Sequence, residues 1–201
     1  MSLSAGRAAR VCGARPGYHR PMEDAANLVL VGPMGAGKSV VGARLAKRLG
    51  RPFVDLDAVI EAEAGRSVAA LFAAEGEDGF RARESALLAR CLAGDPCVIA
   101  TGGGAVLDAE NRRRLGEQAF VVWLAAEPAT QLERVAGSHE RPLLQVPDPA
   151  AVLDRLAAER TPHYRALADL HLDTDGLSTD QVVDALDAMI RKRLSPAGGV
   201  A

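Results

Sequence analysis

One loop of this 201-residue chain carries the glycines, lysine and serine needed to hold a row of phosphates. An apolar run at 28–31 leads directly into GPMGAGKS at 32–39, and a helical pattern follows. Glycines let backbone N–H groups turn inward around a phosphate, and the helix N-terminus adds a partial positive charge. Lys38 can reach the β- and γ-phosphates, and the Ser39 hydroxyl can be a ligand of Mg²⁺. The motif predicts a site for a nucleoside triphosphate.

Two aspartates follow the second apolar run, in FVDLD at 53–57. Alternation along a strand would put Asp55 and Asp57 on the same side of the chain. One carboxylate could hold a water bound to Mg²⁺, and the other could accept a proton from a substrate hydroxyl. Asp57 could instead only cap the next helix. Beside a phosphate loop, catalysis is the preferred interpretation.

Three consecutive glycines, Gly102, Gly103 and Gly104, follow the third apolar run. They cost backbone entropy, so the chain must need either unusual dihedral angles or the close approach of another group. An ordinary wide turn is the alternative. Their position at the end of a strand favours contact with a ligand.

The elements that must position these residues alternate regularly along the chain. Short apolar runs lie at 28–32, 53–57, 97–102, 119–124 and 170–174. Helical patterns separate them, and Gly, Pro, Asp or Thr bounds each run, which is typical of buried parallel strands. The pattern predicts an α/β fold in three layers, with a five-stranded parallel sheet between helices. Ligands bind at the carboxyl ends of such strands, where the residues above cluster.

Four segments depart from the alternation. Residues 1–26 carry four arginines and no apolar periodicity, and we expect a disordered tail there and at 195–201. A transit peptide is the alternative for the first segment, but it has few serines and no continuous amphipathic face. Residues 57–96 hold three helical stretches between the second and third strands, and residues 137–148 are rich in turn formers, which is typical of a lid.

The composition limits the classes of partner. Hydrophobic residues make up 48% of the chain and charged residues 25%, as in a globular domain. A net charge of −2 gives no general attraction to nucleic acid or to anionic membranes, and no apolar run is long enough to span a bilayer. The cysteines and histidines form no CxxC or HExxH motif, which argues against a disulfide framework or a zinc site. We expect a cytoplasmic monomer that acts on small molecules.

Six motifs, in order, resemble those of the shikimate kinases. They are GPMGAGKS, FVDLD, EAGRSVAALFAAEGEDGFRARES, TGGGAVL, HERPLL and ERTPHYRALA. The resemblance implies a P-loop NTPase fold like that of the nucleoside monophosphate kinases over residues 27–194, with 57–96 as the shikimate-binding insertion and 137–148 as the lid. It also implies transfer of the γ-phosphoryl of ATP to the 3-hydroxyl of shikimate, with Mg²⁺, in aromatic amino-acid biosynthesis.

The resemblance gives roles to single residues. Lys38, Asp57 and Arg141 would be catalytic, with Asp57 orienting or deprotonating the acceptor and Arg141 reaching from the lid to the transferred phosphoryl. Asp55 would lie near the hydrated Mg²⁺, and Ser39 would bind the ion. The nucleotide would contact Gly35, Ala36, Gly37, Lys38, Ser39, Val40 and, at the adenine, Arg134.

The substrate would contact Asp57 and Gly102, Gly103 and Gly104, and two arginines, Arg81 and Arg165, would clamp its carboxylate. Planar guanidinium groups suit this task because they bind carboxylates through two parallel hydrogen bonds. Glu84, one helical turn from Arg81, would brace that arginine. Because the chain is rich in arginine, a solvated helix face is the alternative for either one.

Two other functions are alternatives to shikimate phosphorylation. A gluconate kinase would share the phosphate loop, but TGGG, RPLL and the YR motif are not expected in it together. A ligand-sensing module of a transcription regulator would need a helix-turn-helix, and residues 1–26 show no two-helix pattern.

Overall fold

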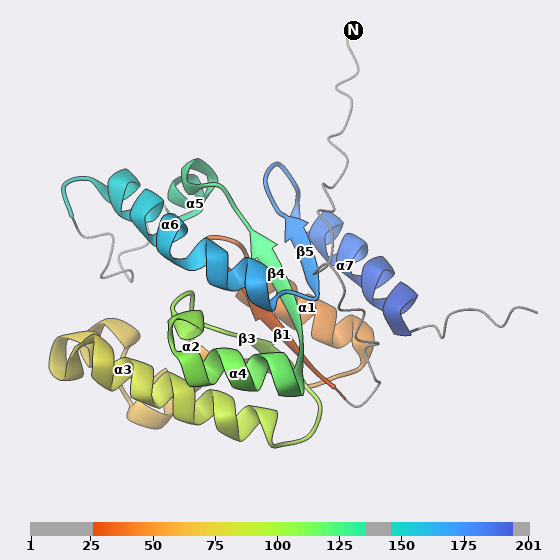
Figure 1. The fold of residues 1–201 in the computed structure, drawn as a ribbon, viewed down its shortest axis with the longest axis horizontal. Coiled ribbons are helices and arrows are strands. Elements are labelled where there is room, and N and C mark those ends of the chain that lie inside the picture. The colour runs from red at the N-terminus through yellow and green to blue at the C-terminus, as the bar shows by residue number, and fades with distance from the viewer. Residues whose placement is uncertain (1–25, 136–145, 195–201) are drawn as a thin grey trace, which may run out of the picture.

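The computed structural model describes residues 26–135 and 146–194, and Figure 1 shows a central sheet with helices on both faces. The strands are β1 (Asn27–Val31), β2 (Phe53–Asp55), β3 (Val98–Ala100), β4 (Ala119–Ala125) and β5 (Leu170–Asp173). They form a five-stranded sheet in the order β2-β3-β1-β4-β5, and every neighbouring pair is parallel. The predicted α/β architecture is confirmed.

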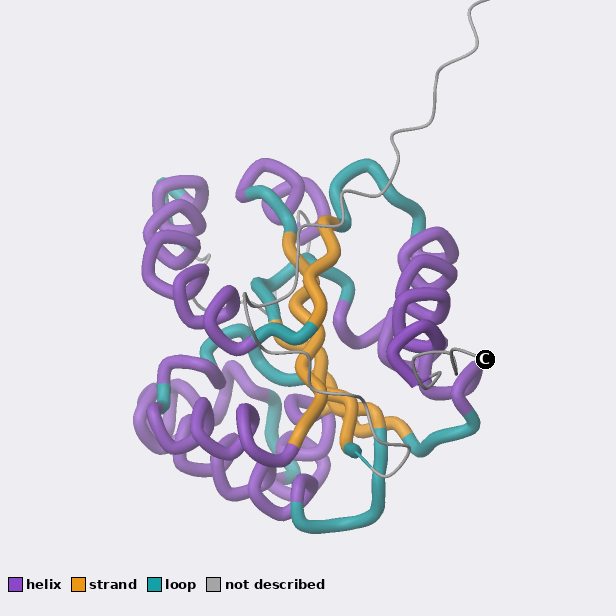
Figure 2. Tube along the Cα trace, turned by 45° about the vertical axis from the view of Figure 1, so that its right-hand side comes forward, coloured by secondary structure: helices purple, strands orange, loops and turns teal. Residues whose placement is uncertain are grey.

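Helices complete the outer layers, as the edge-on view of the sheet in Figure 2 shows. They are α1 (Lys38–Leu49), α2 (Leu56–Ala64), α3 (Val68–Leu92), α4 (Ala109–Gln118), α5 (Pro128–Val135), α6 (Pro149–Leu167) and α7 (Thr179–Leu194), with a 3₁₀ turn at Ala105–Leu107. The segment predicted to hold three helical stretches contains α2 and α3, and α3 is broken at Gly76 by a non-helical backbone conformation.

The sheet is buried on both faces, which explains the unbroken apolar runs. Alternate residues of β1 enter different core clusters: Leu28 and Leu30 pack with α1 and α7, whereas Val29 and Val31 pack with α2, α3, α4 and α6. All four side chains are fully buried. Burial on both faces is the usual state of a parallel sheet, and it fixes the strand ends at which the polar residues emerge.

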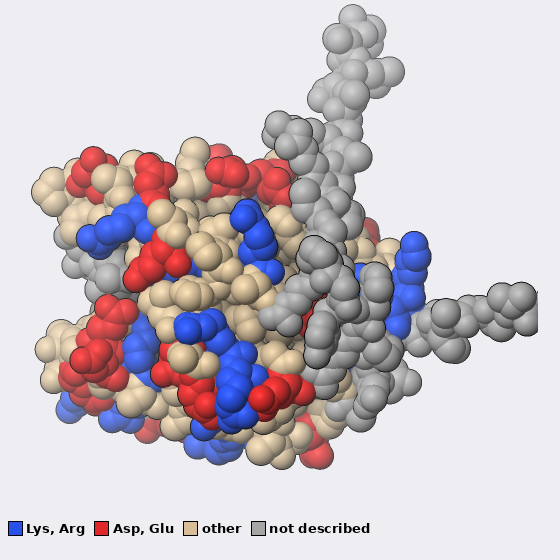
Figure 3. Space-filling model, viewed as in Figure 1, with Lys and Arg blue, Asp and Glu red and all other residues tan. Residues whose placement is uncertain are grey.

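The charged surface is mixed in sign. Figure 3 shows basic and acidic side chains lying next to one another over α3 and α4. On α4, for example, Arg113 forms ion pairs with Glu110 and Glu117 at 2.7 and 2.5 Å. Exposed pairs of this kind contribute little stability, but they offset the positive charge of the helix surface. Attraction for an anionic ligand must therefore come from a local site.

Several predictions from the sequence concern segments outside the described residues. These are the expected tails, apart from Ala26, and the expected lid, apart from 146–148, so the position of Arg141 is not described. Within the described ranges, no helix has the length and apolar character needed to cross a membrane.

The phosphate loop begins at a glycine that packs against the backbone of β4. Gly32 has a φ of +143°, and a Cβ added there would lie 2.1 Å from the carbonyl oxygen of Leu124. We predict that Gly32→Ala lowers the free energy of unfolding by about 1–3 kcal/mol or more, because both the dihedral angle and the contact are unfavourable.

Urea denaturation measures this effect, and Gly116→Ala is the matched control. Gly116 lies in α4 with no atom within 4 Å of an added Cβ, so alanine should stabilise the chain there by about 0.4–1 kcal/mol. Equal stability of Gly32→Ala and the unmodified chain would show that β1 and β4 are not packed as described.

Candidate active site

The residues predicted from the phosphate loop and the two aspartates converge on one cavity of about 390 Å³. Its lining includes Gly35, Gly37, Lys38, Ser39, Val40, Asp55, Asp57, Gly102, Gly103 and Arg134. Ala36, in the same loop, is buried beneath it. The Nζ of Lys38 donates to the carbonyl oxygens of Gly32 and Pro33 at 2.8 and 2.7 Å, which holds the lysine across its own loop. The cavity therefore joins a phosphate cradle to a pair of carboxylates.

The two aspartates line this cavity, but they do not lie on one strand as predicted. The strand β2 ends at Asp55, and Asp57 already lies in the first turn of α2, so strand alternation does not relate them. Asp55 is the residue that caps α2, because its Oδ1 accepts hydrogen bonds from the N–H groups of Asp57 and Ala58 at 3.1 and 3.4 Å. Helix capping thus occupies Asp55, and the side chain of Asp57 turns toward Gly102.

Charged side chains approach the three glycines closely, and at Gly102 and Gly104 they leave no room for a Cβ. A Cβ on Gly102 would lie 2.3 Å from Oε1 of Glu84, and a Cβ on Gly104 would lie 2.2 Å from Nη2 of Arg81. At Gly103 the nearest atom is Nη1 of Arg160, at 3.3 Å. The expected close approach to this backbone is therefore made by side chains of α3 and α6, and the glycines create room for them.

Arg81 is held in place from several sides. Its Nη1 donates to Oε2 of Glu84 at 2.7 Å, and its Nη2 donates to Glu77 at 3.1 Å. The rings of Phe72 and Phe80 lie 5.9 and 5.5 Å from its guanidinium carbon, within the range of cation–π attraction. Glu84 is fully buried, which raises the pKa of its carboxyl, and the Arg81 guanidinium opposes that rise. This geometry agrees with the predicted bracing of Arg81 by Glu84.

The expected pairing of Arg81 with Arg165 does not occur. Arg160, which is 5% exposed, is the α6 arginine beside the glycines, whereas Arg165 is exposed and is not among the atoms nearest to Gly102, Gly103 or Gly104. The reason is the helical phase: Leu153, Arg160, Tyr164 and Leu167 form the buried face of α6, and Arg165 follows Tyr164 by one residue. An arginine at an apolar position of this helical pattern was the signal that could have identified Arg160.

Tyr164 ties α6 to the glycine backbone. Its hydroxyl donates to the carbonyl oxygen of Gly103 at 2.5 Å. Burial raises the pKa of Tyr164, which keeps the phenol protonated and able to donate. In the YR motif the arginine was the predicted site residue, whereas the structure shows the tyrosine in contact with the Gly103 backbone.

Arg134 connects the phosphate loop to the segment after β5. Its Nη1 donates to the carbonyl oxygen of Gly35 at 3.1 Å and to Oγ1 of Thr174 at 2.9 Å, and its Nη2 donates to the Thr174 carbonyl at 2.7 Å. Its position at the rim of the cavity agrees with a role beside the nucleotide.

A magnesium ion fits this donor set. Mg²⁺ keeps several waters and is usually held by one or two protein oxygens together with substrate phosphates, and Ser39 and Asp55 both line the cavity. No cluster of three or more His, Cys, Asp or Glu suited to a metal occurs in residues 26–135 and 146–194. The phosphates of a nucleotide would have to complete the coordination.

Comparisons with known proteins agree on one family. The family model described as shikimate kinase matches residues 34–191. A shikimate kinase from Symbiobacterium thermophilum is 54% identical over 169 residues, which are 83% of this chain and 97% of the relative. A shikimate kinase from Acinetobacter baumannii, solved in complex with shikimate, is 39% identical with a TM-score of 0.82 and covers 85% of this chain and 95% of its own. A gluconokinase from Sinorhizobium meliloti, 18% identical with a TM-score of 0.56 over 85% of this chain and 94% of its own, shares the fold.

We predict that Tyr164→Phe lowers both stability and affinity for the phosphoryl acceptor, although it removes no charge. The buried carbonyl of Gly103 loses its donor, which should lower the free energy of unfolding by about 1–3 kcal/mol and raise the KM for the phosphoryl acceptor several-fold. Steady-state kinetics provide an internal control, because Tyr164 does not line the phosphate-loop cavity and the KM for ATP should stay the same. An unchanged acceptor KM would mean that Tyr164 does not position the glycine backbone.

Proposed function

The chain belongs to the shikimate kinase family, and on that premise we propose how its side chains bind and activate the two substrates. The chain transfers the γ-phosphoryl of ATP to the 3-hydroxyl of shikimate, which gives shikimate 3-phosphate and ADP. The observation that carries the proposal is the convergence of Arg81 and Arg160 on neighbouring glycines, with Asp57 at the other end of the glycine segment.

The nucleotide would bind in the cavity of about 390 Å³, where the loop N–H groups and Lys38 face its phosphates. Lys38 would exchange its bonds to the Gly32 and Pro33 carbonyls for bonds to phosphate oxygens. Ser39 and, through water, Asp55 would hold Mg²⁺, which supplies positive charge to the β- and γ-phosphate oxygens. Arg134 would lie against the adenine.

Shikimate would lie along residues 102–104 with its two ends in different environments. Its carboxylate would meet Arg81 near Gly104 and Arg160 near Gly103, and two planar cations can hold a carboxylate in one orientation. Asp57 has its Oδ1 3.3 Å from the position of a Cβ on Gly102, so a hydroxyl at that end would face a carboxylate. The segment thus provides a cationic end for the acid and an anionic end for the alcohol.

In this orientation of shikimate, the γ-phosphoryl of ATP would pass directly to the 3-hydroxyl. Asp57 would orient the 3-hydroxyl and accept its proton as the oxygen attacks the γ-phosphorus and the bond to the β-phosphate oxygen breaks. Lys38, and Arg141 from outside the described residues, would stabilise the charge on the transferred phosphoryl. We further propose that the enzyme works as a cytoplasmic monomer.

Gluconate kinase is the second candidate, because gluconate also carries a carboxylate and several hydroxyls. The gluconokinase neighbour shows likeness of fold alone. The spacing between a carboxylate clamp and Asp57 should favour the rigid ring of shikimate over an open chain, whose ordering costs conformational entropy.

The first prediction concerns the phosphate loop. Lys38→Ala should lower kcat at least about a hundredfold, because a preorganised cation next to the transferred phosphoryl is lost. Lys47→Ala is the matched control: Lys47 is exposed on α1 and its loss should leave the activity unchanged. Normal turnover by Lys38→Ala would contradict the proposed nucleotide site.

The second prediction separates Arg160 from Arg165 in a coupled assay of ADP release with shikimate, quinate and gluconate. Arg160→Lys should lower kcat/KM for shikimate about ten- to a hundredfold, because lysine keeps the charge but loses the planar fork. Arg165→Lys should leave kcat/KM for shikimate unchanged, since Arg165 is exposed and is not among the atoms nearest to Gly102, Gly103 or Gly104. A larger loss in Arg165→Lys than in Arg160→Lys, or faster turnover of gluconate than of shikimate, would overturn the proposal.

A further inference from the structure

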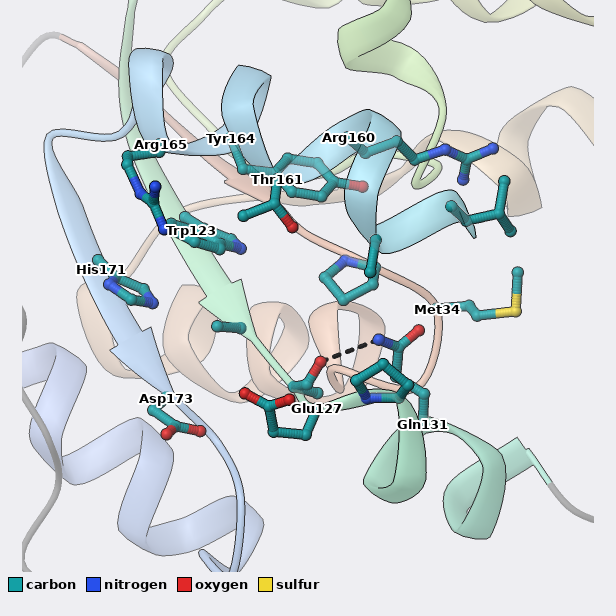
Figure 4. Close-up of a pocket in the computed structure, with 16 residues that line it drawn as sticks. Met34, Trp123, Glu127, Gln131, Arg160, Thr161, Tyr164, Arg165, His171 and Asp173 are labelled. Atoms are coloured by element: carbon teal, nitrogen blue, oxygen red, sulfur yellow. Dashed lines mark hydrogen bonds between the residues drawn. The ribbon is translucent and has the colours of Figure 1, made fainter. Parts of the chain in front are cut away.

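A second cavity lies between α5, α6 and the ends of β4 and β5, next to the active site, and two residues of the phosphate loop, Pro33 and Met34, form part of its lining (Figure 4). Its volume is about 240 Å³, somewhat below the roughly 300–1,000 Å³ of typical ligand pockets, so any occupant must be small. The proposed mechanism places neither substrate in this cavity, although Arg160 and Tyr164 belong both to its lining and to the proposed site.

The charged and polar side chains of this cavity are sorted by sign. In Figure 4, Arg165 and Thr161 project from α6 on one side, whereas the carboxylates of Glu127 and Asp173 lie on the opposite side. The Gln131 side chain fixes the wall near the carboxylates, because its Nε2 donates to the carbonyl oxygen of Ala126 at 2.9 Å. A ligand in this space would meet donors on one side and anionic acceptors on the other.

Two buried ring nitrogens at the cavity wall lack hydrogen-bond partners among the described residues. They are Nε1 of Trp123 and Nε2 of His171. Trp123 is 6% exposed, and the rings of His171 and Tyr164 cover it, at centroid distances of 3.9 and 5.9 Å. Since these rings occupy its faces, the indole can offer a ligand only its edge N–H. A buried donor without a partner is costly, and a polar occupant would relieve that cost.

The cavity lining also includes apolar side chains, Pro33 and Met34 from the phosphate loop and Leu156 and Ala157 from α6. Figure 4 shows Met34 on the side away from His171 and Asp173, with Arg160 toward the same side. The cavity therefore combines a positive edge, a negative edge and apolar side chains within one small volume.

We propose that this cavity binds a small zwitterion, namely an α-amino acid with an apolar side chain. Its carboxylate would face Arg165 and the Trp123 N–H, its ammonium group would face Glu127 and Asp173, and its side chain would point toward Met34 and Leu156. A simple anion would lie against two carboxylates, and a simple cation would lie against Arg165. Only a molecule that carries both charges satisfies both edges.

An occupant would contact elements that also build the active site. Met34 lines both cavities, and Arg160 lines this one while its Nη1 reaches toward Gly103. The ligand would therefore touch the phosphate loop and α6 without entering the space assigned to ATP or shikimate.

Calorimetric titration of the full chain, without ATP or shikimate, tests the ligand class. The probes are L-leucine and L-phenylalanine, together with 3-methylbutylamine and 4-methylpentanoate, which are leucine without its carboxylate and without its ammonium group. An amino acid should bind once per chain, and each analogue should bind at least about tenfold more weakly, because one charged hydrogen-bonding group is missing.

Variants locate the site. Arg165→Gln should weaken binding of the amino acid about tenfold, Asp173→Asn should do the same, and Ala157→Leu should abolish binding by filling the apolar part of the cavity. Arg191→Gln and Asp187→Asn are the matched controls, since this ion pair lies on α7 and neither residue lines the cavity, and they should bind as the unmodified chain does. Thermal unfolding of each variant verifies that it is folded.

Three results would overturn the proposal. The first is the absence of saturable binding by either amino acid with a Kd below about 1 mM. The second is equal affinity of the unmodified chain, Arg165→Gln and Asp173→Asn for the amino acid. Tight binding of the amine or the acid alone would also contradict it, because one charge would then suffice.

Discussion

The site depends on the direct packing of charged side chains against the backbone of residues 102–104. Glu84 and Arg81 come from α3 and lie where a Cβ on Gly102 or Gly104 would have to be, and Arg160 comes from α6 and lies 3.3 Å from the position of a Cβ on Gly103. This contact relates the positions of α3 and α6, the two helices that carry the arginines of the proposed carboxylate clamp. A methyl group at Gly102 or Gly104 would force one of the charged groups away, so the glycine backbone and the arginines act as one unit.

Such packing requires that the charges be compensated before the substrate arrives. Glu84 is fully buried and bonded to Arg81, and isolated burial of either charge would be strongly unfavourable. The desolvation free energy of Arg81 and Glu84 is therefore lost during folding and not during substrate binding. The Arg81 guanidinium is then already oriented to meet a carboxylate. Preorganisation of this kind reduces the free energy needed to order the site during binding and catalysis. The parallel sheet contributes by ending β1, β2 and β3 at one edge, which brings the phosphate loop and Asp57 to the same glycines.

The sheet and the phosphate loop could be predicted from the sequence, because each depends on a local pattern of residues. Apolar runs between turn formers located the strands, and GPMGAGKS identified the phosphate loop. Helical phase was harder to predict: the motif indicated Arg165 for the carboxylate clamp, whereas Arg160 lies on the buried face of α6. The end of β2 was also harder to predict, because capping by Asp55 starts a helix before Asp57. The second cavity could not be predicted, because it joins side chains of α5, α6, β4 and β5 that no motif relates.

The most direct test of the carboxylate clamp compares shikimate with its methyl ester, which keeps the ring and hydroxyls but removes the negative charge. Values of kcat/KM for both are measured with the unmodified chain, Arg160→Met and Arg165→Met. The account predicts that the unmodified chain prefers the acid by at least about tenfold, that Arg165→Met keeps this preference, and that Arg160→Met loses most of it. An undiminished preference for the acid in Arg160→Met would contradict the account.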